Sequence, residues 1–412
     1  MHDLRRRTSV ITLVAVASIL GLAGCSKASS SSETGGAQTI HAVGFGKMPA
    51  SILADFKKKT GITVNWDFVD TATFPQVLQS RVAAKSDIDI VNLRGGAEFN
   101  KYAKAKTFVP LTGDSFLANV TAGGLAPGKY NGTQYGYSAS SYVIGIFYNK
   151  GLFQKAGVQI PTTWDQFTAA ADRLSAAGIA PLVGAQGDGW TNQYYYHTAI
   201  AQYAADHPSF MADLQSGKAK WSQNDLFTKQ IDRFQGLVSK KYFLNGTQSF
   251  KYADALAAFN SGKAAMWAMG DWALADLKPQ GFAPGAFAVP FSDAAPASSL
   301  SDNMFAATSW SKKQSEAKQF LAFLTQKDQA KAYSVELNKA SAIKDVTATI
   351  SPYQSDWDKL LPNAVPFPSN LGPSVNGSGP DLLGNIFAGK SSPSEAVSGF
   401  QKLQDSDNVS GY

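Results

Sequence analysis

Residues 40–68 read IHAVGFGKMPASILADFKKKTGITVNWDF, and this stretch decides the fold class. The apolar segment Ile40–Phe45 predicts a short strand, and Ala50–Lys59 predicts a helix because its apolar residues recur on one face. Apolar and polar residues then alternate over Ile62–Phe68, which is the period of a second strand. A strand, a helix and another strand in this order are the unit of a parallel sheet covered by helices.

The same alternation extends outward and predicts an α/β protein. Further strands are expected at residues 88–91, 142–148, 180–184 and 264–268. Helices are expected at residues 74–84, 97–105, 226–238 and 315–325, after the capping box Thr163-Trp164-Asp165-Gln166, and from Gly270-Asp271-Trp272. Residues 351–385 are rich in Pro, Gly, Ser and Asn, which predicts loops with short helices.

The N-terminus resembles a bacterial lipoprotein signal peptide. Three arginines precede an apolar run at residues 10–22, which is shorter than the about 20 residues that span a bilayer. The run ends in Leu22-Ala23-Gly24-Cys25, which resembles a lipobox. We therefore expect residues 1–24 to be the signal peptide, Cys25 to be lipidated, and residues 25–38 to be the lipidated cysteine and a flexible tether. The expected location is the extracytoplasmic face of the cell membrane.

Composition excludes several classes of site. Cys25 is the only cysteine, so no disulfide can form within the chain and no cysteine-ligated metal site is expected. The net charge of +6 is scattered, and the one basic triplet, Lys57–Lys59, ends a predicted helix where cations suit the helix dipole. No nucleic-acid partner is expected. Residues 39–412 are too many for one small core, which favours two domains.

Two basic residues fall where a parallel sheet would bind a ligand. Open sheets of this kind bind beyond the carboxyl ends of their strands. Those ends are expected at residues 44–47, 70–73 and 92–96. Lys47 and Arg94 are long donors at two of these ends, and each is a candidate ligand contact that could equally be a solvated loop charge.

Six segments follow one another in a recognisable order. They are Asp89-Ile90-Val91 with Tyr102 and Leu111-Thr112, Ile146–Lys150 with Leu152-Phe153, Thr163–Phe167, Ala257–Met266, Gly270-Asp271-Trp272, and Ala317–Leu324. Together they resemble the family 1 extracellular solute-binding proteins, the group that includes maltose-binding protein. The resemblance covers nearly all of the chain after the tether.

The resemblance implies a two-lobed periplasmic-binding-protein type II fold with a hinge and an interlobe ligand cleft. One lobe would take residues 39–138 and 303–350, and the other residues 139–302 and 351–412. It also implies a monomeric substrate-binding lipoprotein of an ABC importer, which captures a carbohydrate by hinge closure and delivers it to the permease. No cofactor or metal is expected. The membrane would be contacted through the lipid anchor alone.

Candidate ligand residues follow from this resemblance and from sugar chemistry. Trp272 matches the family's cleft tryptophan and is expected to stack on a sugar ring, with Asp271 beside it accepting hydroxyl hydrogens. Trp190 and Asp188 belong to a Gly-flanked loop where the family has ligand contacts. Two candidate tryptophans favour a di- or oligosaccharide over a monosaccharide.

Four further candidates come from the expected crossovers and the late loop. Ser138 and Tyr142 fall where the hinge and the second lobe begin, Asn303 falls in the second crossover, and Asn376 falls in a Gly-rich loop. Tyr142 stands where maltose-binding protein has a ligand-contacting Glu, which argues against a malto-oligosaccharide as the ligand.

Other functions have weaker support in the sequence. The histidines show no metal spacing, no GxSxG elbow is present, and Asp188 with Asp271 is the only carboxylate pair that could serve a glycosidase. We therefore expect no enzyme. Because Lys47 and Arg94 are cations, an anionic solute is an alternative ligand, and a polyol is another. The run Tyr194–His197 resembles the tyrosine ligands of ferric-iron binding proteins, although an aromatic helix packed on the sheet explains this run better. A sensory lipoprotein without a transporter stays open as well.

Overall fold

The computed structural model describes residues 38–70, 73–290, 296–301, 303–368 and 371–410. The signal peptide at 1–24, the lipidation site Cys25 and nearly all of the tether at 25–38 therefore lie outside the described residues. The described residues belong to one compact unit.

The first sheet confirms the strand pattern expected for the opening stretch. Its strands are β2 (Thr63–Phe68), β1 (Thr39–Gly44), β3 (Ile90–Leu93), β12 (Met304–Ala307) and β6 (Tyr137–Ser138), in this spatial order. β1 runs parallel to β2 and β3, with Gly44 level with both Phe68 and Asn92. β12 joins from much later in the chain and pairs antiparallel with β3 and β6. The carboxyl ends of β1, β2 and β3 therefore meet at one edge.

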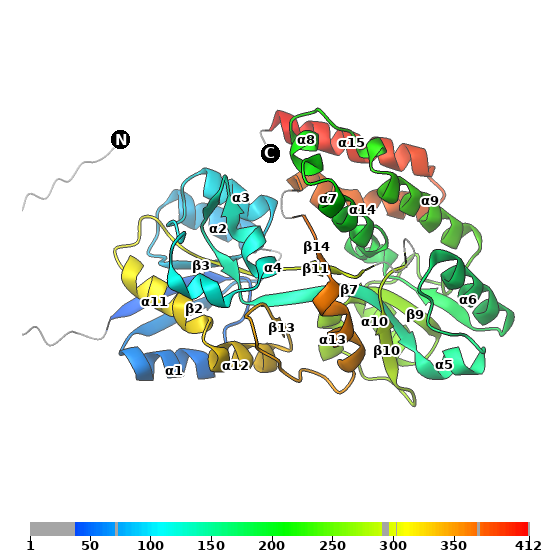
Figure 1. The fold of residues 1–412 in the computed structure, drawn as a ribbon, viewed down its shortest axis with the longest axis horizontal. Helices are drawn as coiled ribbons and strands as arrows, with labels where there is room; N and C mark the ends of the chain where they lie inside the picture. Colours follow the sequence, from blue (N-terminus) through cyan, green and yellow to red (C-terminus); the bar gives the residue numbers. More distant parts are fainter. Residues whose placement is uncertain (1–37, 71–72, 291–295, 302, 369–370, 411–412) are drawn as a thin grey trace, which may run out of the picture. The chain divides into compact units, whose positions relative to one another are not determined.

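Helices cover both faces of this sheet (Figure 1). They are α1 (Ala50–Thr60), α2 (Phe74–Ala83), α3 (Ala97–Lys104), α4 (Ala122–Leu125), α11 (Gln314–Leu324) and α12 (Lys327–Leu337). Two short 3-10 helices, η1 (Ser115–Asn119) and η2 (Ala126–Gly128), and the hairpin β4 (Lys129–Tyr130)–β5 (Thr133–Gln134) connect them. On one face Phe56 of α1 packs against Phe320 of α11, with ring centroids 5.0 Å apart. Gly61 ends α1 in the left-handed region, as its sequence position predicts.

The second sheet is built around one long buried strand. Its order is β14 (Val365–Pro366), β11 (Ser298–Leu300), β7 (Ser140–Asn149), β9 (Ala264–Gly270) and β8 (Ala180–Val183). β10 (Pro284–Phe287) and β13 (Ala340–Ser341) also pair with β7. All ten residues of β7 are buried, which explains why its central residues, 142–148, are apolar or aromatic on both faces and do not alternate with polar ones.

The remaining helices pack around this second sheet. They are α5 (Lys150–Lys155), α6 (Trp164–Ala176), α7 (His197–Asp206), α8 (Phe210–Gln215), α9 (Asp225–Ser239), α10 (Tyr252–Asn260), α13 (Ser355–Leu360), α14 (Pro373–Phe387) and α15 (Pro393–Val409). The 3-10 helices η3 (Gln186–Asp188), η4 (Trp190–Tyr195), η5 (Trp221–Gln223), η6 (Asp271–Ala275) and η7 (Leu361–Asn363) lie between them. Figure 1 shows α14 and α15, orange and red, beside α7, α8 and α9 in green. The last part of the chain thus packs on segments far earlier in the sequence.

The chain passes between the two sheets within a few residues. β6 ends at Ser138 in the first sheet and β7 begins at Ser140 in the second. β11 ends at Leu300 in the second sheet, and β12 begins at Met304 in the first. Ala340 and Ser341 pair with the first residues of β7. Asn303 therefore lies directly at a crossover, as the sequence predicts.

Three local expectations were wrong. Thr163 does cap α6, but the Gln166 side chain accepts from the backbone N–H and hydroxyl of Thr162, so the capping box is not closed on Thr163. Gly270-Asp271-Trp272 opens a short 3-10 helix and not an α-helix. Residues 373–387, expected to be loop-rich, form the α-helix α14, because buried apolar residues at helical spacing pack it against α15.

Candidate ligand site

Four aromatic side chains form a continuous row beside the second sheet. Trp190 and Tyr194 lie in η4, Trp272 lies in η6, and Tyr142 lies in β7. The ring centroids of Trp190 and Tyr194 are 5.9 Å apart, and those of Tyr194 and Trp272 are 5.6 Å apart. Those of Trp272 and Tyr142 are 5.4 Å apart, in an edge-to-face contact. We call these four residues the aromatic row.

Two glycines shape this row. A Cβ on Gly270 would lie 1.8 Å from Cζ3 of Trp272, so the indole lies directly against the Gly270 backbone. Gly189 has φ +56°, in the left-handed region that favours glycine, and the chain turns there immediately before Trp190. Trp190 keeps 38% of its surface exposed and stacks on Tyr252 at 5.9 Å. An exposed tryptophan held by a second ring is a preformed apolar platform.

The two predicted carboxylates have different surroundings. Oδ2 of Asp188 accepts the backbone N–H of Tyr252 at 2.6 Å, which ties the turn before Trp190 to the first residue of α10. Asp271 is only 4% exposed. Burial raises the pKa of its carboxyl group to about 8, and the charge of Asp358 adds to the rise. The backbone amides of Val143, Asp271 and Trp272 act in the opposite direction.

Asn303 connects Tyr142 to the first sheet. Its Nδ2 donates to the Tyr142 hydroxyl at 2.8 Å. A Cβ on Gly46 would lie 3.3 Å from Oδ1 of Asn303 and 2.7 Å from Oδ1 of Asn92, so the loop after β1 passes close to both amides. The structure therefore brings the loop that carries Lys47 near the Tyr142 end of the aromatic row.

Two predicted residues have other local roles. Ser138 is fully buried, and its hydroxyl donates to the carbonyl oxygen of Ser140 at 2.7 Å, within the crossover itself. Asn376 was expected in a loop but lies in the first turns of α14, where its side chain is exposed. None of the contacts among the described residues joins the Asn376 side chain to the aromatic row.

The first sheet contributes two cations at the carboxyl ends of its strands. Nζ of Lys47 lies 5.8 Å from the ring centroid of Phe68, and the guanidinium of Arg94 lies 5.6 Å from that of Phe45. Both cations are exposed, and neither forms an ion pair within 4.0 Å among the described residues. Phe68 is itself 46% exposed. This edge therefore offers positive charge and apolar ring surface together.

The structure adds residues that the sequence interpretation missed. Tyr194 was expected to pack on the sheet, and it is indeed buried in the core at 3% exposure. Its ring also contacts both Trp190 and Trp272, which the i, i+4 spacing of Trp190 and Tyr194 could have indicated. Tyr252 supports Trp190 from a distant helix. Lys339 places its Nζ 5.9 Å from the ring centroid of Tyr142, and no pattern in the sequence indicated this contact.

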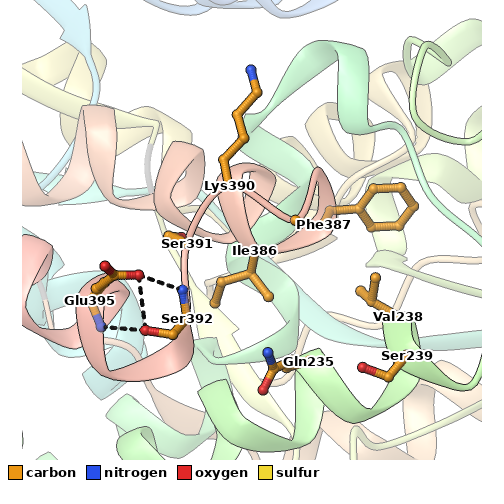
Figure 2. A pocket seen from close by; sticks show the side chains of 10 residues that line it. Gln235, Val238, Ser239, Ile386, Phe387, Lys390, Ser391, Ser392 and Glu395 are labelled. Carbon is orange, nitrogen blue, oxygen red and sulfur yellow. Dashed lines mark hydrogen bonds between the residues drawn. The ribbon is translucent and has the colours of Figure 1, made fainter.

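Two surface pockets lie elsewhere. One of about 400 Å³ is lined by the end of α9 and by the turn from α14 to α15, where Ser392 and Glu395 bond to each other (Figure 2). Another of about 420 Å³ lies beside β1, β2 and α2, with His41, Asp67 and Arg81 in its lining. None of the predicted ligand residues lines either pocket.

The described residues also limit other chemistry. Across the ranges that the structure covers, His, Cys, Asp and Glu side chains do not gather in groups of three or more that could hold a metal ion. Within the same ranges, no helix has the length and apolar character needed to cross a membrane. Within the aromatic row, the exposed Trp190 and the half-buried Trp272 can offer ring surface to a ligand. Tyr194 and Tyr142 are 3% and 6% exposed and pack against them.

Comparison with known proteins identifies the class. The family model described as "Bacterial extracellular solute-binding protein" matches residues 41–331, and the chain belongs to this family. The "Multiple sugar-binding protein" of Streptococcus mutans is 27% identical over 296 residues, which cover 69% of this chain and 70% of that protein.

Solved structures share the fold. A family 1 extracellular solute-binding protein from Bifidobacterium longum subsp. infantis superposes with a TM-score of 0.77 at 22% identity, covering 90% of this chain and 100% of that one. The structure of "SBP RafE in complex with raffinose" gives a TM-score of 0.72 at 22% identity, covering 90% and 99%. The expected two-lobed periplasmic-binding-protein type II fold is thereby confirmed.

Proposed function

We propose that this protein captures a di- or oligosaccharide outside the cytoplasm and delivers it to the permease of an ABC importer. The observation that carries the proposal is the aromatic row, in which four rings follow one another at 5.4 to 5.9 Å between centroids. Sugar rings present C–H faces that pack on aromatic faces. The exposed Trp190 and the half-buried Trp272, supported by the buried Tyr194 and Tyr142, offer two such surfaces, which favours a ligand with more than one sugar ring. The name of the Streptococcus mutans relative supports the sugar class.

Ligand capture would work by lobe closure. We assign residues 39–138 and 303–350 to one lobe and 139–302 and 351–412 to the other. A ligand that contacts the aromatic row of the second lobe and Lys47 or Arg94 of the first would bind the closed state more tightly, and so shift the population toward it. We propose that Ser138, Tyr142 and Asn303, which lie at or next to the crossovers, couple ligand contact to that motion.

The anchor is the second part of the proposal. We assign residues 1–24 as a lipoprotein signal peptide and Cys25 as the lipidated residue, because Leu22-Ala23-Gly24-Cys25 resembles a lipobox. The extracellular family to which the chain belongs supports an extracytoplasmic location. Labelling with a radioactive fatty acid tests the anchor: Cys25→Ser is expected to abolish incorporation, and label retained in that variant would refute it.

A catalytic role for the two carboxylates has little support. Asp188 is engaged by a backbone amide, and Asp271 is buried away from solvent, whereas a glycosidase needs two accessible carboxyl groups on either side of a bond. The tyrosines at 194–196 also do not converge as iron ligands would: their rings pack on Trp272, Phe234 and Phe400 respectively.

An anionic solute is a second candidate, because Lys47 and Arg94 are exposed cations at the carboxyl ends of neighbouring strands. One thermal-shift screen separates the two. The panel contains glucose, sucrose, raffinose, maltotriose, xylotriose, a trigalacturonate, glucose 6-phosphate and ferric citrate. A ligand present at 1,000 times its dissociation constant adds about 4 kcal/mol to stability. Shifts with neutral oligosaccharides are expected; shifts with the phosphate or ferric salt alone would overturn the proposal.

A further inference from the structure

Lysines gather at the edge of the first sheet where its parallel strands begin. Thr39 of β1 lies level with Thr63 of β2, and the backbone N–H of Asp89, just before β3, donates to the carbonyl oxygen of His41 at 2.7 Å. The amino ends of these strands therefore meet at the edge opposite the candidate ligand contacts. We call the seven lysines on the segments that meet here the amino-edge lysines: Lys57–Lys59, Lys85, Lys106, Lys312 and Lys313.

Hydrogen bonds join the segment after β12 to this edge. Nζ of Lys313 donates to the carbonyl oxygen of Thr39, the first residue of β1, at 2.7 Å. The hydroxyl of Ser309 donates to the carbonyl oxygen of Lys106 at 2.8 Å. This segment therefore lies beside both the start of β1 and the turn after α3.

Two helix ends complete the edge. Lys57–Lys59 occupy the last turn of α1, shortly before β2 begins. Nε1 of Trp310 donates to the carbonyl oxygen of Ser86 at 2.9 Å, which places the neighbouring Lys85, at the end of α2, beside the same segment. Six of the seven lysines are exposed, and Lys313 is half-buried.

Helix dipoles do not account for the whole set. Cations suit the C-terminal ends of α1, α2 and α3. Lys312 and Lys313, however, directly precede α11, and cations are unfavourable at a helix N-terminus. Among the described residues, none of the seven forms an ion pair within 4.0 Å. The edge therefore keeps like charges together without internal compensation.

The acidic residues on the same segments are fewer and are partly engaged. Asp89 is 2% exposed, and its Oδ2 accepts the backbone N–H of His41 at 2.8 Å. Oδ2 of Asp87 lies 3.3 Å from Nε2 of His41, and Oδ2 of Asp55 accepts a side-chain amide from α12. Glu316 is half-buried in the first turn of α11. These acids offset only part of the positive charge.

The charge is also uneven along the chain. Residues 39–138 and 303–350, which include the first sheet, contain 18 Lys and Arg against 11 Asp and Glu. Residues 139–302 and 351–412 contain 15 Lys and Arg against 18 Asp and Glu. The excess of positive charge thus belongs to the part of the chain that carries the amino edge, which favours an anionic partner there.

The segment that carries the proposed anchor enters the fold at this same edge. The backbone N–H of Thr63 donates to the carbonyl oxygen of Gln38, where the described chain begins, at 2.8 Å. Gln38 follows Cys25 by 13 residues. A chain of that length spans at most about 45 Å even when fully extended. A lipid on Cys25 would therefore hold the amino edge within this distance of the bilayer.

We propose that the amino-edge lysines form a docking surface for the anionic headgroups of the lipid bilayer that carries Cys25. Clustered lysines are attracted to an anionic membrane surface, and the attraction falls off within a Debye length. The carboxyl ends of β1, β2 and β3 lie at the other end of the strands, so this contact leaves Lys47 and Arg94 accessible. The choice of partner rests on the proposed anchor, whereas the vesicle test below does not need it.

The first experiment is cosedimentation of residues 25–412 carrying Cys25→Ser, a chain without lipid, with two kinds of vesicle. One contains phosphatidylcholine alone, and the other contains equal parts of phosphatidylcholine and phosphatidylglycerol. Binding to the anionic vesicles alone is expected. It should be lost when salt rises from about 10 to about 100 mM, which shortens the screening length from about 30 to about 10 Å. Equal binding to both kinds of vesicle, or no binding at low salt, would overturn the proposal.

Substitutions locate the surface. In the same chain, the triple change Lys57→Gln, Lys58→Gln, Lys59→Gln is expected to weaken binding to the anionic vesicles at least about tenfold. The matched control changes three exposed lysines of α5, α9 and α15 (Lys155→Gln, Lys229→Gln, Lys402→Gln) and should stay within about twofold. An equal loss in the control would assign the binding to net charge and overturn the proposal.

Two further measurements keep the test decisive. If the triple variant does not fold, as judged by its melting temperature, the double variant Lys106→Gln, Lys312→Gln leaves α1 intact and is expected to lose at least about fivefold; wild-type binding in that variant would contradict the surface. Binding to soluble polyphosphate but not to anionic vesicles would assign the edge to another polyanion. Vesicle binding in a protein that incorporates no fatty acid would refute the anchor and leave the surface standing, whereas incorporation without vesicle binding would refute the surface alone.

Discussion

The two sheets present different kinds of surface at the ends that face the candidate site. On the side of the first sheet, Lys47 and Arg94 are exposed, and each contacts a single phenylalanine ring. On the side of the second sheet, the aromatic row is interlocked, with every ring touching the next. Side chains already fixed in place lose less entropy when a ligand binds. From this difference we expect the second sheet to supply most of the affinity for the proposed ligand, and the first sheet to supply charge and closure.

The largest expected effect is at the centre of the row. Trp272→Ala removes a ring that contacts both Tyr194 and Tyr142, and we expect it to weaken carbohydrate binding by roughly 1–3 kcal/mol. Titration calorimetry measures the change, with Trp221→Phe, a fully buried tryptophan outside the row, as the control. Unchanged affinity in Trp272→Ala would contradict the expectation that the second sheet supplies most of the affinity.

The next effect concerns stability and pH. Because burial raises the pKa of Asp271 from 3.8 to about 8, the folded state binds more protons than the unfolded state between these values. The free energy of unfolding should therefore fall as pH rises toward 8, by at most about 1.4 kcal/mol per pH unit. A comparison with Asp271→Asn from pH 6.5 to 8 isolates this group, because the contribution of buried His197, whose pKa burial lowers to about 3, is common to both proteins.

Chemical denaturation of wild type and Asp271→Asn tests this slope. The wild type is expected to lose stability relative to the variant as pH rises from 6.5 to 8, since the asparagine does not titrate. A constant difference across the window would show that Asp271 is not the group responsible.

A smaller effect is expected at the exposed end of the row. Trp190→Ala should weaken binding of a trisaccharide by about 1 kcal/mol, and binding of a monosaccharide by less, because Trp190 is exposed and lies furthest along the row from Tyr142. Calorimetry with both ligands shows whether the trisaccharide reaches Trp190 and the monosaccharide does not. Equal losses for the two ligands would contradict an extended site.

The smallest effects are expected on the first sheet. Lys47→Gln and Arg94→Gln should change affinity for a neutral oligosaccharide by less than about 0.5 kcal/mol, because exposed cations contribute little. The two substitutions together should weaken binding of a uronic acid oligosaccharide more than binding of a neutral one. Added salt should weaken binding of the uronic acid oligosaccharide in the same way. A large loss of affinity for the neutral ligand would show that the first sheet contributes more to binding than expected.

Sequence patterns predicted most of the fold because periodicity reports burial directly. Strands β1 and β2 and helices α1, α6 and α11 fall where apolar spacing places them. α14 was missed because its glycines and prolines argue against a helix locally, whereas Val375, Leu383 and Ile386 become buried only when α15 packs on it. That packing is a tertiary effect that no local pattern contains.

The candidate site was predictable in its parts but not in its connections. Trp272, Trp190, Tyr142 and Asn303 were named from sequence, and the structure joins Trp272, Tyr142 and Asn303 by direct contact. The rings of Tyr194 and Tyr252 that complete the group come from segments whose distance in the fold the sequence does not give. Burial of Asp271 is likewise a tertiary effect, whereas residue type alone pointed to a surface role.

The most direct test of the central claim is a calorimetric titration of the strongest-binding oligosaccharide into the wild type and into a Trp190→Ala, Trp272→Ala double variant. The account predicts saturable binding at one site in the wild type and no measurable heat of binding in the double variant, with its melting temperature preserved in the absence of ligand. Binding of unchanged affinity in a folded double variant would contradict the aromatic row as the carbohydrate site.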